Sequence, residues 1–470
     1  MSIQQAEPGS FRDRNGRIFY QNGKVLRGLS QKALGEWETL KKTRFFPQAL
    51  AKGKLVRTEP IESGAIQFKS NSADNWAGVL QHETIPFISY PYEWCFSMLK
   101  DAALLHLELL SAALKENMVL KDSSAFNVQW KGKNPVFIDI PSFETLGDGE
   151  PWVGYRQFCQ MFLYPLMLQS YKNIDFHTWL RGDIDGIMPS AMTQLMGGFT
   201  RFKRGILTHV VLQALLENKH AHTRKDVKSD LKKLGFNKRL IEANVEGLTG
   251  LIKRLTWDVK QSEWADYTDL GHYSEQAMAD KRDFVKQVCA GKRRKLVWDS
   301  GCNTGVFSRI AADHADYVVA MDADHLAIDR LYQTLKVHEP ANNILPLVVN
   351  MVSTSPALGW RGLERKTLAD RGKPDLLLCL ALIHHIVISA NVPLEEFVEW
   401  LADLGCEVII EFVTKQDPMV KKLLLNKADI YDDYTLDNFE NNARRHFKLD
   451  KKTELDSGTR FLYLLHPKTV

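Results

Sequence analysis

The sequence lacks the features that mark disulfide-bonded, exported or membrane-spanning proteins. Its six cysteines are scattered and contain no C-x-x-C pair, so no disulfide framework or redox motif is indicated. No run of about 18 apolar residues is present to span a bilayer. The N-terminal stretch MSIQQAEPGSFRDRNGR also has no apolar core of a signal peptide. These absences predict a cytoplasmic protein with reduced thiols and no membrane partner.

The charge balance and the composition are those of an ordinary globular protein. The 61 Lys and Arg residues nearly balance 57 Asp and Glu residues, and a net charge of +4 is small for 470 residues. Composition alone therefore indicates no dedicated polyanion partner. The hydrophobic content of 44% is ordinary for a globular protein. The chain is too long for one core, so we expect two domains.

The two halves of the chain have different patterns, and we place the boundary between residues 255 and 256. In the second half, short apolar runs alternate with helical segments, which predicts a parallel sheet with helices on both faces. The predicted strands are KLVWD, YVVAMD, ILPLVVN, PDLLLCLA and CEVIIEF. The later segments HFKLDK and TRFLYLLH flank Ser457-Gly458 and predict an antiparallel hairpin at one sheet edge.

The first half, residues 1–255, has a mixed pattern. The segment GRIFYQNGKVLRG predicts two strands joined by an Asn22-Gly23 turn. Helical patterns follow in QKALGEWETLKKTRFFPQALAKG and YEWCFSMLKDAALLHLELLSAALKEN, and residues 152–255 are almost wholly helical in pattern. We expect an α+β domain whose second part is helical.

The stretch LVWDSGCNTGVFS predicts a strand, a glycine turn and the start of a helix. A helix that begins where a strand ends presents free backbone N–H groups, and glycines let a ligand approach them. A dinucleotide site would require a third glycine. Val306, Phe307 and Ser308 instead continue the helix after Gly305, which weakens the dinucleotide interpretation.

The D-x-G-x-N-x-G pattern from Asp299 to Gly305 resembles the first motif of class I S-adenosylmethionine-dependent methyltransferases. The resemblance implies that Asp299 contacts the amino group of the methionine part. Asp322 lies 21 residues after Gly301, where the family places the acid that accepts the ribose hydroxyls. The resemblance to this family also implies a seven-stranded Rossmann-like sheet with an antiparallel last strand. The implied cofactor-binding residues are Asp299, Gly301, Asn303, Gly305, Asp322, Ala323, Asn350 and Met351, the last two at the adenine.

Two further residues resemble those of a bacterial subgroup of this family, in which a Tyr and a Lys precede the first strand. Tyr273 and Lys281 are eight residues apart on an expected helix, hence near one face. The resemblance implies a role beside the cofactor. A solvated lysine and a half-buried tyrosine are the alternative interpretation.

The candidates for catalysis follow the fourth and fifth predicted strands. Methyl transfer is an in-line displacement in which alignment supplies much of the acceleration. A base is needed only for a protonated acceptor, and His384 or His385 could serve as a neutral imidazole near pH 7. Since adjacent helical residues point about 100° apart, we expect only one to face the methyl group. Glu411 is a second candidate, and we expect no metal at this site.

In the first half, Asp122, Asn127 and Asp139 resemble the catalytic loop and metal-binding aspartate of protein-kinase-like and aminoglycoside-kinase-like folds. The resemblance implies that Asp122 is a base and that Asn127 and Asp139 hold magnesium. VLQHETIPFISYPYEW resembles the hinge between lobes. No glycine-rich loop is present, and Lys24 or Arg27 only approximates the strand lysine. We therefore predict a degenerate kinase-like domain, with a simple Asp-Asn turn as the alternative.

The leading functional prediction is a methyltransferase that uses S-adenosylmethionine and acts on an unidentified acceptor, with a small molecule or glycan favoured. Charge runs at residues 292–295 and in HTRKDVKSDLKKLGFNKR leave an RNA-modifying methyltransferase as an alternative. A bifunctional enzyme with phosphoryl transfer and a non-catalytic nucleoside sensor are two others. The insertion SPALGWRGLERKTLADRGKPD could be a substrate lid or an amphipathic helix that packs Trp360 on the core. The acceptor atom and oligomeric state are not predicted.

Overall fold

A computed structural model describes residues 5–61, 76–215, 237–259, 273–339, 342–425 and 427–468. The chain forms two compact units. Unit 1 comprises Met1–Trp130, Pro135–Asp258 and Ala357–Arg365, and unit 2 comprises Lys131–Asn134, Val259–Pro356 and Lys366–Val470. The chain therefore passes between the units several times.

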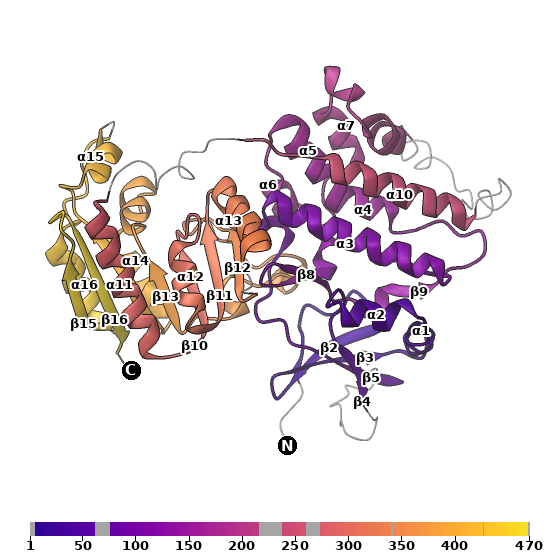
Figure 1. Cartoon of the computed structure of the whole chain (residues 1–470), viewed down its shortest axis with the longest axis horizontal. Coiled ribbons are helices and arrows are strands. Elements are labelled where there is room, and N and C mark those ends of the chain that lie inside the picture. The colour runs from indigo at the N-terminus through magenta and orange to yellow at the C-terminus, as the bar shows by residue number, and fades with distance from the viewer. Residues whose placement is uncertain are drawn as a thin grey trace. The chain divides into compact units, whose positions relative to one another are not determined.

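Unit 1 begins with a five-stranded antiparallel sheet (Figure 1). Its strand order is β1 (Gln5–Ala6), β2 (Gly16–Gln21), β3 (Lys24–Leu29), β5 (Gly78–His82) and β4 (Thr58–Ile61). The predicted hairpin between β2 and β3 is confirmed, with Asn22 and Gly23 in the left-handed region that such a turn requires. The helical pattern at residues 31–53 forms two helices, α1 (Gln31–Leu40) and α2 (Phe45–Ala51).

The remainder of unit 1 is mainly helical. Helix α3 (Phe96–Lys115) is its buried centre and packs against α10 (Lys238–Arg254). Four short strands form two small sheets, β6 (Met118–Leu120) with β9 (Phe143–Thr145), and β7 (Val128–Lys131) with β8 (Asn134–Phe137). Further α-helices in the described part of this unit are α4 (Tyr155–Phe158), α5 (Tyr164–Lys172), α6 (His177–Gly182) and α7 (Pro189–Leu195).

Unit 2 contains a seven-stranded mixed sheet. Its order is β12 (Ile344–Val348), β11 (Ala315–Asp322), β10 (Arg294–Ser300), β13 (Leu376–Cys379), β14 (Glu407–Val413), β16 (Arg460–Pro467) and β15 (Phe447–Glu454). The first five strands are parallel, and β16 runs antiparallel to both neighbours. The predicted parallel strands and the closing hairpin are confirmed.

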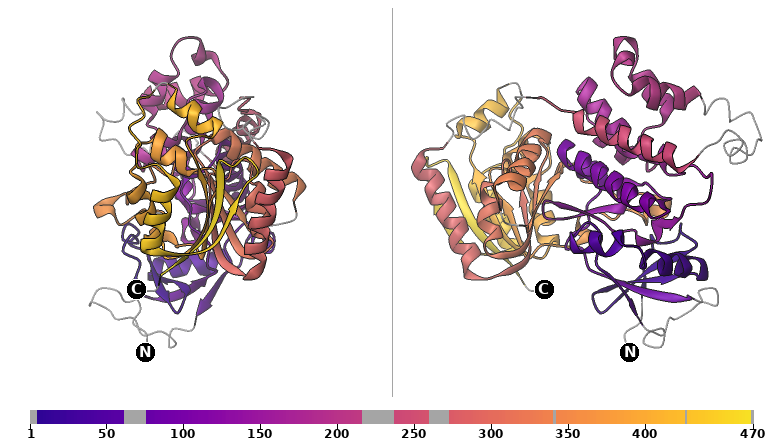
Figure 2. Two further views of the ribbon diagram at one scale, coloured as in Figure 1. Left: turned by 90° about the vertical axis from the view of Figure 1, so that its left-hand side faces the viewer. Right: turned by 45° about the vertical axis from the view of Figure 1, so that its right-hand side comes forward.

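Helices cover both faces of this sheet, with α11 (Glu275–Gly291) on one face and α14 (Leu394–Asp403) and α16 (Leu436–His446) on the other (Figure 2). The remaining helices are α12 (Val306–Ala312), α13 (His325–His338) and α15 (Pro418–Leu424). Because both faces are covered, the central strands are apolar runs that are almost continuously buried. Within the described ranges, no helix has the length and apolar character to cross a membrane.

Candidate active site

The turn after β10 is built from three residues in the left-handed region. The φ angles are 76° at Gly301, 49° at Asn303 and 81° at Gly305. A Cβ atom on Gly305 would lie 2.6 Å from Leu331 Cδ1, so glycine is needed there for α12 to pack. A Cβ on Gly301 would meet nothing closer than Leu382 Cδ1 at 3.5 Å. That distance is an ordinary contact, so the left-handed φ, and not a lack of space, favours glycine at position 301.

Two carboxylates lie at the ends of the neighbouring strands β10 and β11. Asp299 is buried and accepts a hydrogen bond from Ser308 Oγ at 2.6 Å. Burial raises the pKa of Asp299 to about 6, and the Asp322 charge adds to this. Asp322 accepts from the backbone N–H of Asn303 at 2.8 Å and of Asp324 at 2.9 Å. Asp322 thus fixes the glycine turn, and burial also raises its pKa.

The other predicted cofactor residues lie at the same edge of the sheet. Ala323 directly follows β11 and is exposed. Asn350 follows β12 and is exposed, and its Oδ1 accepts from the backbone N–H of Val352 at 3.1 Å. Met351 is half-buried. Since β10, β11 and β12 are parallel neighbours, their carboxyl ends bring these residues to one edge of the sheet.

Tyr273 and Lys281 belong to a buried ionic network. Lys281 Nζ lies 2.5 Å from Glu411 Oε2 and donates to the Tyr273 hydroxyl at 3.1 Å. The Tyr273 hydroxyl donates to Glu411 Oε1 at 2.8 Å. Lys281 is 3% exposed and Glu411 is 0% exposed, so the interpretation of a solvated lysine is wrong. Tyr273 also lies outside the expected helix, because Ser274 is the N-cap of α11.

Arg460 at the start of β16 completes this network, and the sequence patterns did not identify it. Its guanidinium lies 3.3 Å from Glu411 Oε1 and donates to Asp417 through Nε at 2.7 Å. It also donates to the Tyr273 hydroxyl. The only sequence signal was a basic residue at the start of an otherwise apolar strand. Its position depends on the antiparallel pairing of β16 with β14, which aligns Arg460 with Val413.

The network changes the ionisation of its members. Burial lowers the pKa of Lys281, although Glu411 opposes this. Burial would raise the pKa of Glu411, but the facing Lys281 and Arg460 cations outweigh it, and the pKa lies below its ordinary value. Glu411 is therefore held in its charged form between Lys281 and Arg460, and Asp417 is a second carboxylate beside Arg460.

His384 and His385 follow β13 at the same sheet edge. His384 is 0% exposed, and neither of its ring nitrogens has a hydrogen-bond partner among the residues that the structure describes. The two ring centroids are 4.2 Å apart, and the expectation that only one of them faces the methyl group stays a prediction. Burial lowers the pKa of His385 to about 4 and that of His384 well below its ordinary value. Both imidazoles are thus neutral, and His384 is suited to forming hydrogen bonds.

In unit 1, the kinase-like residues also come together. Burial raises the pKa of Asp122, and the nearby Asp139 charge and a hydrogen bond with Asn127 contribute with opposite signs. Asp139 accepts from Arg27 at 2.7 Å and from Ser142 Oγ. A cation of β3 therefore neutralises the carboxylate that would hold magnesium in a kinase-like site.

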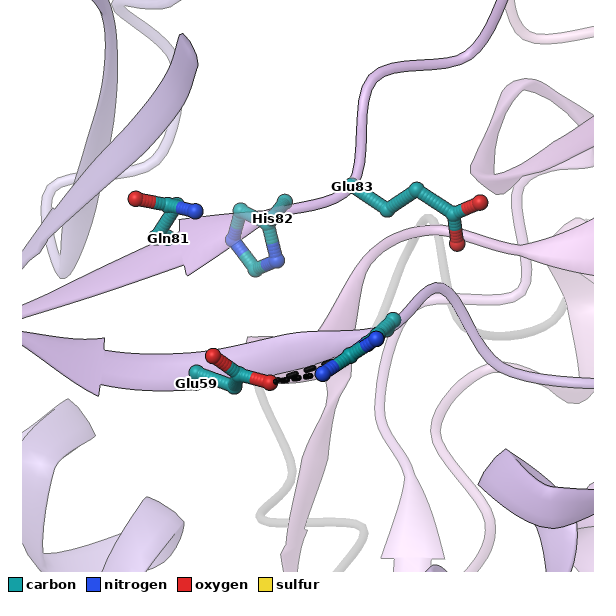
Figure 3. A pocket seen from close by; sticks show the side chains of 5 residues that line it. Glu59, Gln81, His82 and Glu83 are labelled. Carbon is teal, nitrogen blue, oxygen red and sulfur yellow. Dashed lines mark hydrogen bonds and ion pairs between the residues drawn. The ribbon is translucent and has the colours of Figure 1, made fainter.

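A pocket in unit 1 is separate from these groups. It lies beside the paired strands β4 and β5 and is lined by Arg57, Glu59, Gln81, His82 and Glu83 (Figure 3). Arg57 and Glu59 pair with each other at its wall. His82 bonds to Thr58 Oγ1, and burial lowers its pKa to about 3. None of the predicted site residues lines this pocket.

The structure changes the interpretation of the residues that suggested RNA binding or a substrate lid. In the first charge run, Arg294 is buried against Glu407 at 2.6 Å and Arg293 pairs with Asp316. Most of the second run lies outside the described residues. Trp360 is exposed in a short 3₁₀ turn, so packing of Trp360 on the core is wrong.

Together, the strand order and the acid-glycine turn define the fold of a class I S-adenosylmethionine-dependent methyltransferase in unit 2. Over 457 residues, the chain is 34% identical to nodulation protein NoeA of Rhizobium meliloti (strain 1021), covering 97% of this chain and 94% of that protein. The chain belongs to the NoeA family. No family model matches it.

Solved structures similar to part of the chain include several methyltransferases. N-methyltransferase NodS from Bradyrhizobium japonicum WM9, in complex with S-adenosyl-L-homocysteine, covers 44% of this chain and all of its own at 9% identity and a TM-score of 0.33. WbdD matches 47% of this chain and 46% of its own at 18% identity, with a TM-score of 0.31. Magnesium protoporphyrin IX methyltransferase from Synechocystis PCC 6803 matches 45% and 90% at 18% identity, with a TM-score of 0.29.

Proposed function

We propose that unit 2 binds S-adenosylmethionine and transfers its methyl group to a polar acceptor. The observation that carries this proposal is the left-handed turn after β10, where Gly301 is only partly buried and Asp322 fixes the turn from the next strand. Nucleosides bind open α/β sheets at the carboxyl ends of the strands, beside such a glycine turn. A carboxylate there can accept both hydroxyls of a ribose.

The residues present fit this cofactor. Asp322 accepts the backbone N–H of Asn303 and that of Asp324 through different oxygens. A carboxylate has about four lone-pair sites, so it can also accept ribose hydroxyls. Asp299 would attract the cofactor's amino group, and Asn350 and Met351 would lie at the adenine. Bound there, the cofactor supplies a methyl group on a positively charged sulfur. We assign Tyr273 and Lys281 to the wall of this site, because their polar atoms are engaged with Glu411.

We assign the acceptor to the ends of β13 and β14. His384 is buried there with both ring nitrogens lacking partners in the described part of the chain. A buried polar group without a partner is costly, and an acceptor hydroxyl or amine would supply the missing hydrogen bond. Because the pKa values of both histidines are lowered, we propose that they orient the acceptor and do not carry a proton from one step to the next. His384 would then accept the acceptor's proton only as the methyl group transfers.

We favour a small molecule or a glycan as the acceptor. The paired and buried arginines of residues 292–295 weaken the RNA alternative. The relative's name assigns it to nodulation, and we propose that this chain acts in the same process. For unit 1 we propose a degenerate kinase-like domain, because Arg27 occupies the Asp139 carboxylate.

Calorimetric titration with S-adenosylhomocysteine tests the cofactor site. Asp322→Ala should weaken binding at least about tenfold, since hydrogen bonds to a charged group contribute about 1.5–3 kcal/mol each. Asp316→Ala is the matched control, because Asp316 lies near the start of the same strand and pairs with exposed Arg293. Unchanged affinity in a folded Asp322→Ala protein would refute the assignment.

Incubation with methyl-labelled cofactor tests the activity. The substrates would be separate small-molecule, oligosaccharide and RNA fractions of a bacterial extract. We expect label in one of the first two fractions, and none with Asp322→Ala. Label only in RNA would establish the alternative function. Tight cofactor binding without label in any fraction would favour a nucleoside sensor.

A further inference from the structure

Unit 1 carries a surface loop that combines exposed aromatic rings with positive charge. The loop, residues 197–207, follows α7 and has the sequence GGFTRFKRGIL. Phe199 is 94% exposed and Phe202 is 80% exposed. Arg201, Lys203 and Arg204 are exposed beside them. The whole stretch from Gly186 to Leu216 contains no Asp or Glu, so nothing in the local sequence offsets these charges.

The loop has a defined conformation that holds both rings outward. Residues Gly198–Phe202 form a 3₁₀ turn, and because that helix has three residues per turn, Phe199 and Phe202 lie on one side. The turn is anchored beneath by Ile206, which is 0% exposed. Gly205 lets the chain lie close to α10, since a Cβ there would lie 2.6 Å from Leu251 Cδ2.

A tyrosine of α5 fixes the basic side of the loop. The Tyr171 hydroxyl donates to the Arg204 carbonyl at 3.0 Å. Lys203 Nζ lies 5.9 Å from the centre of the Tyr171 ring. The Lys203 cation and the Arg204 backbone are therefore held beside the turn that carries Phe199 and Phe202.

Exposed apolar patches of this kind are uncommon on a monomer surface and mark interaction sites. We propose that the loop docks unit 1 on the surface of a lipid bilayer that contains anionic headgroups. Phe199 and Phe202 would enter the boundary between headgroups and acyl chains, and the three cations would contact the lipid phosphates. Leu207, which is 55% exposed, favours lipid over nucleic acid, because an aliphatic side chain gains from hydrocarbon and offers no ring for stacking.

This surface contact departs from the expectation of no membrane partner, which was drawn from the absence of a spanning segment and of a signal peptide. It requires no membrane-spanning helix, and it is independent of the methyl transfer proposed for unit 2. Its chemistry is that of a peripheral anchor with two elements, an apolar wedge and a basic rim. Stable anchoring by such sites depends on both elements together.

Flotation of the full chain with vesicles tests the proposal. One set of vesicles would contain phosphatidylcholine alone and another about 30% phosphatidylglycerol, since each cation near an anionic surface contributes about 1 kcal/mol. We expect binding to the anionic vesicles only. Arg201→Gln/Lys203→Gln/Arg204→Gln and Phe199→Ser/Phe202→Ser should each reduce it at least about tenfold.

Matched controls lie in unit 2. Lys421→Gln/Lys422→Gln removes two exposed lysines of α15, and Val337→Ser removes an exposed apolar residue of α13. Both should bind like the unaltered protein. Circular dichroism checks that every variant is folded, which the exposure of the changed side chains makes the expected result.

Four outcomes would overturn the proposal. They are no binding to anionic vesicles, binding that survives both loop variants, equal losses in the unit 2 controls, and a self-association in sedimentation velocity that disappears in Phe199→Ser/Phe202→Ser. The last would assign the loop to a second copy of the chain. An RNA oligonucleotide is tested in parallel, and RNA binding lost in the triple variant with no vesicle binding would assign the loop to nucleic acid.

Discussion

Replacing Glu411 by Gln removes the central anion of the buried network while preserving its size. The side chain is 0% exposed and faces Lys281 at 2.5 Å and Arg460 at 3.3 Å. Breaking a buried ion pair by removing one partner costs about 3–5 kcal/mol, because the other charge remains buried. For a unit of roughly 200 residues, 1 kcal/mol shifts the melting temperature by about 2–4 °C. We therefore expect unit 2 to melt about 6–20 °C lower.

Thermal unfolding of the full chain by calorimetry measures this effect, and Lys281→Met tests its origin. If Glu411→Gln is harmful because it leaves a buried cation, adding Lys281→Met should restore part of the stability, with a coupling of about 1–3 kcal/mol. Glu407→Gln is the control on the same strand. Its partner Arg294 also donates to three backbone carbonyls, so the loss should be smaller.

The lowered pKa of Glu411 makes this stabilisation depend on pH. The pKa of Glu411 is lowered in the folded protein, so its stabilisation is present above the ordinary pKa of 4.5 and is lost as the pH falls toward the lower folded value. The gap between the original protein and Glu411→Gln should narrow on acidification below that pH. A melting temperature within about 2 °C of the original protein at neutral pH, or strictly additive effects of the two substitutions, would refute the argument.

Three other predictions concern the separate parts of the site. The affinity for S-adenosylhomocysteine should increase as the pH rises through about 6, the pKa of Asp299, because the cofactor's amino group requires the ionised carboxylate. In Asp299→Asn, a calorimetric series should show no change of affinity in this pH range, and an unchanged pH dependence would exclude Asp299 as its cause. His384→Asn should lower labelled methyl transfer at least about tenfold while cofactor affinity stays the same, whereas equal, near-native rates in His384→Asn and His385→Asn would leave both with structural roles. Magnesium-ATP should produce neither a thermal shift nor phosphate release, since Arg27 neutralises Asp139, and release that vanishes in Asp139→Ala but persists in Asp322→Ala would show a working kinase site.

Much of unit 2 could be predicted because its signals are local. Five apolar runs bounded by turn residues gave the parallel strands, and the order of strand ends brought Asp299 and Asp322 to one sheet edge. The glycine turn was visible because Gly301 and Gly305 have a backbone requirement that few residues meet. The roles of these two glycines differ, however, and only the position of Leu331 on α13 separates them.

The long-range partners could not be read from the sequence. Arg460 and Glu411 are 49 residues apart, and only the antiparallel register of β16 brings them together. The expectation that only one of His384 and His385 faces the methyl group assumed regular helical spacing. The chain instead enters a π-helical turn at His385, after Ala381 in the left-handed region. Such a conformation is unfavourable for alanine and is set by the surrounding structure.

The division of the chain has a consequence for how the two units can be made and inherited. Unit 1 includes Ala357–Arg365, where Glu364 pairs with Arg12 at 2.7 Å across 352 residues of sequence. During synthesis, which proceeds from the N-terminus, unit 1 cannot complete this pair until β10, β11 and β12 of unit 2 have been made. No single cut in the gene yields both units whole. A single recombination point would leave at least one unit without one of its segments, so we expect the two units to be inherited together.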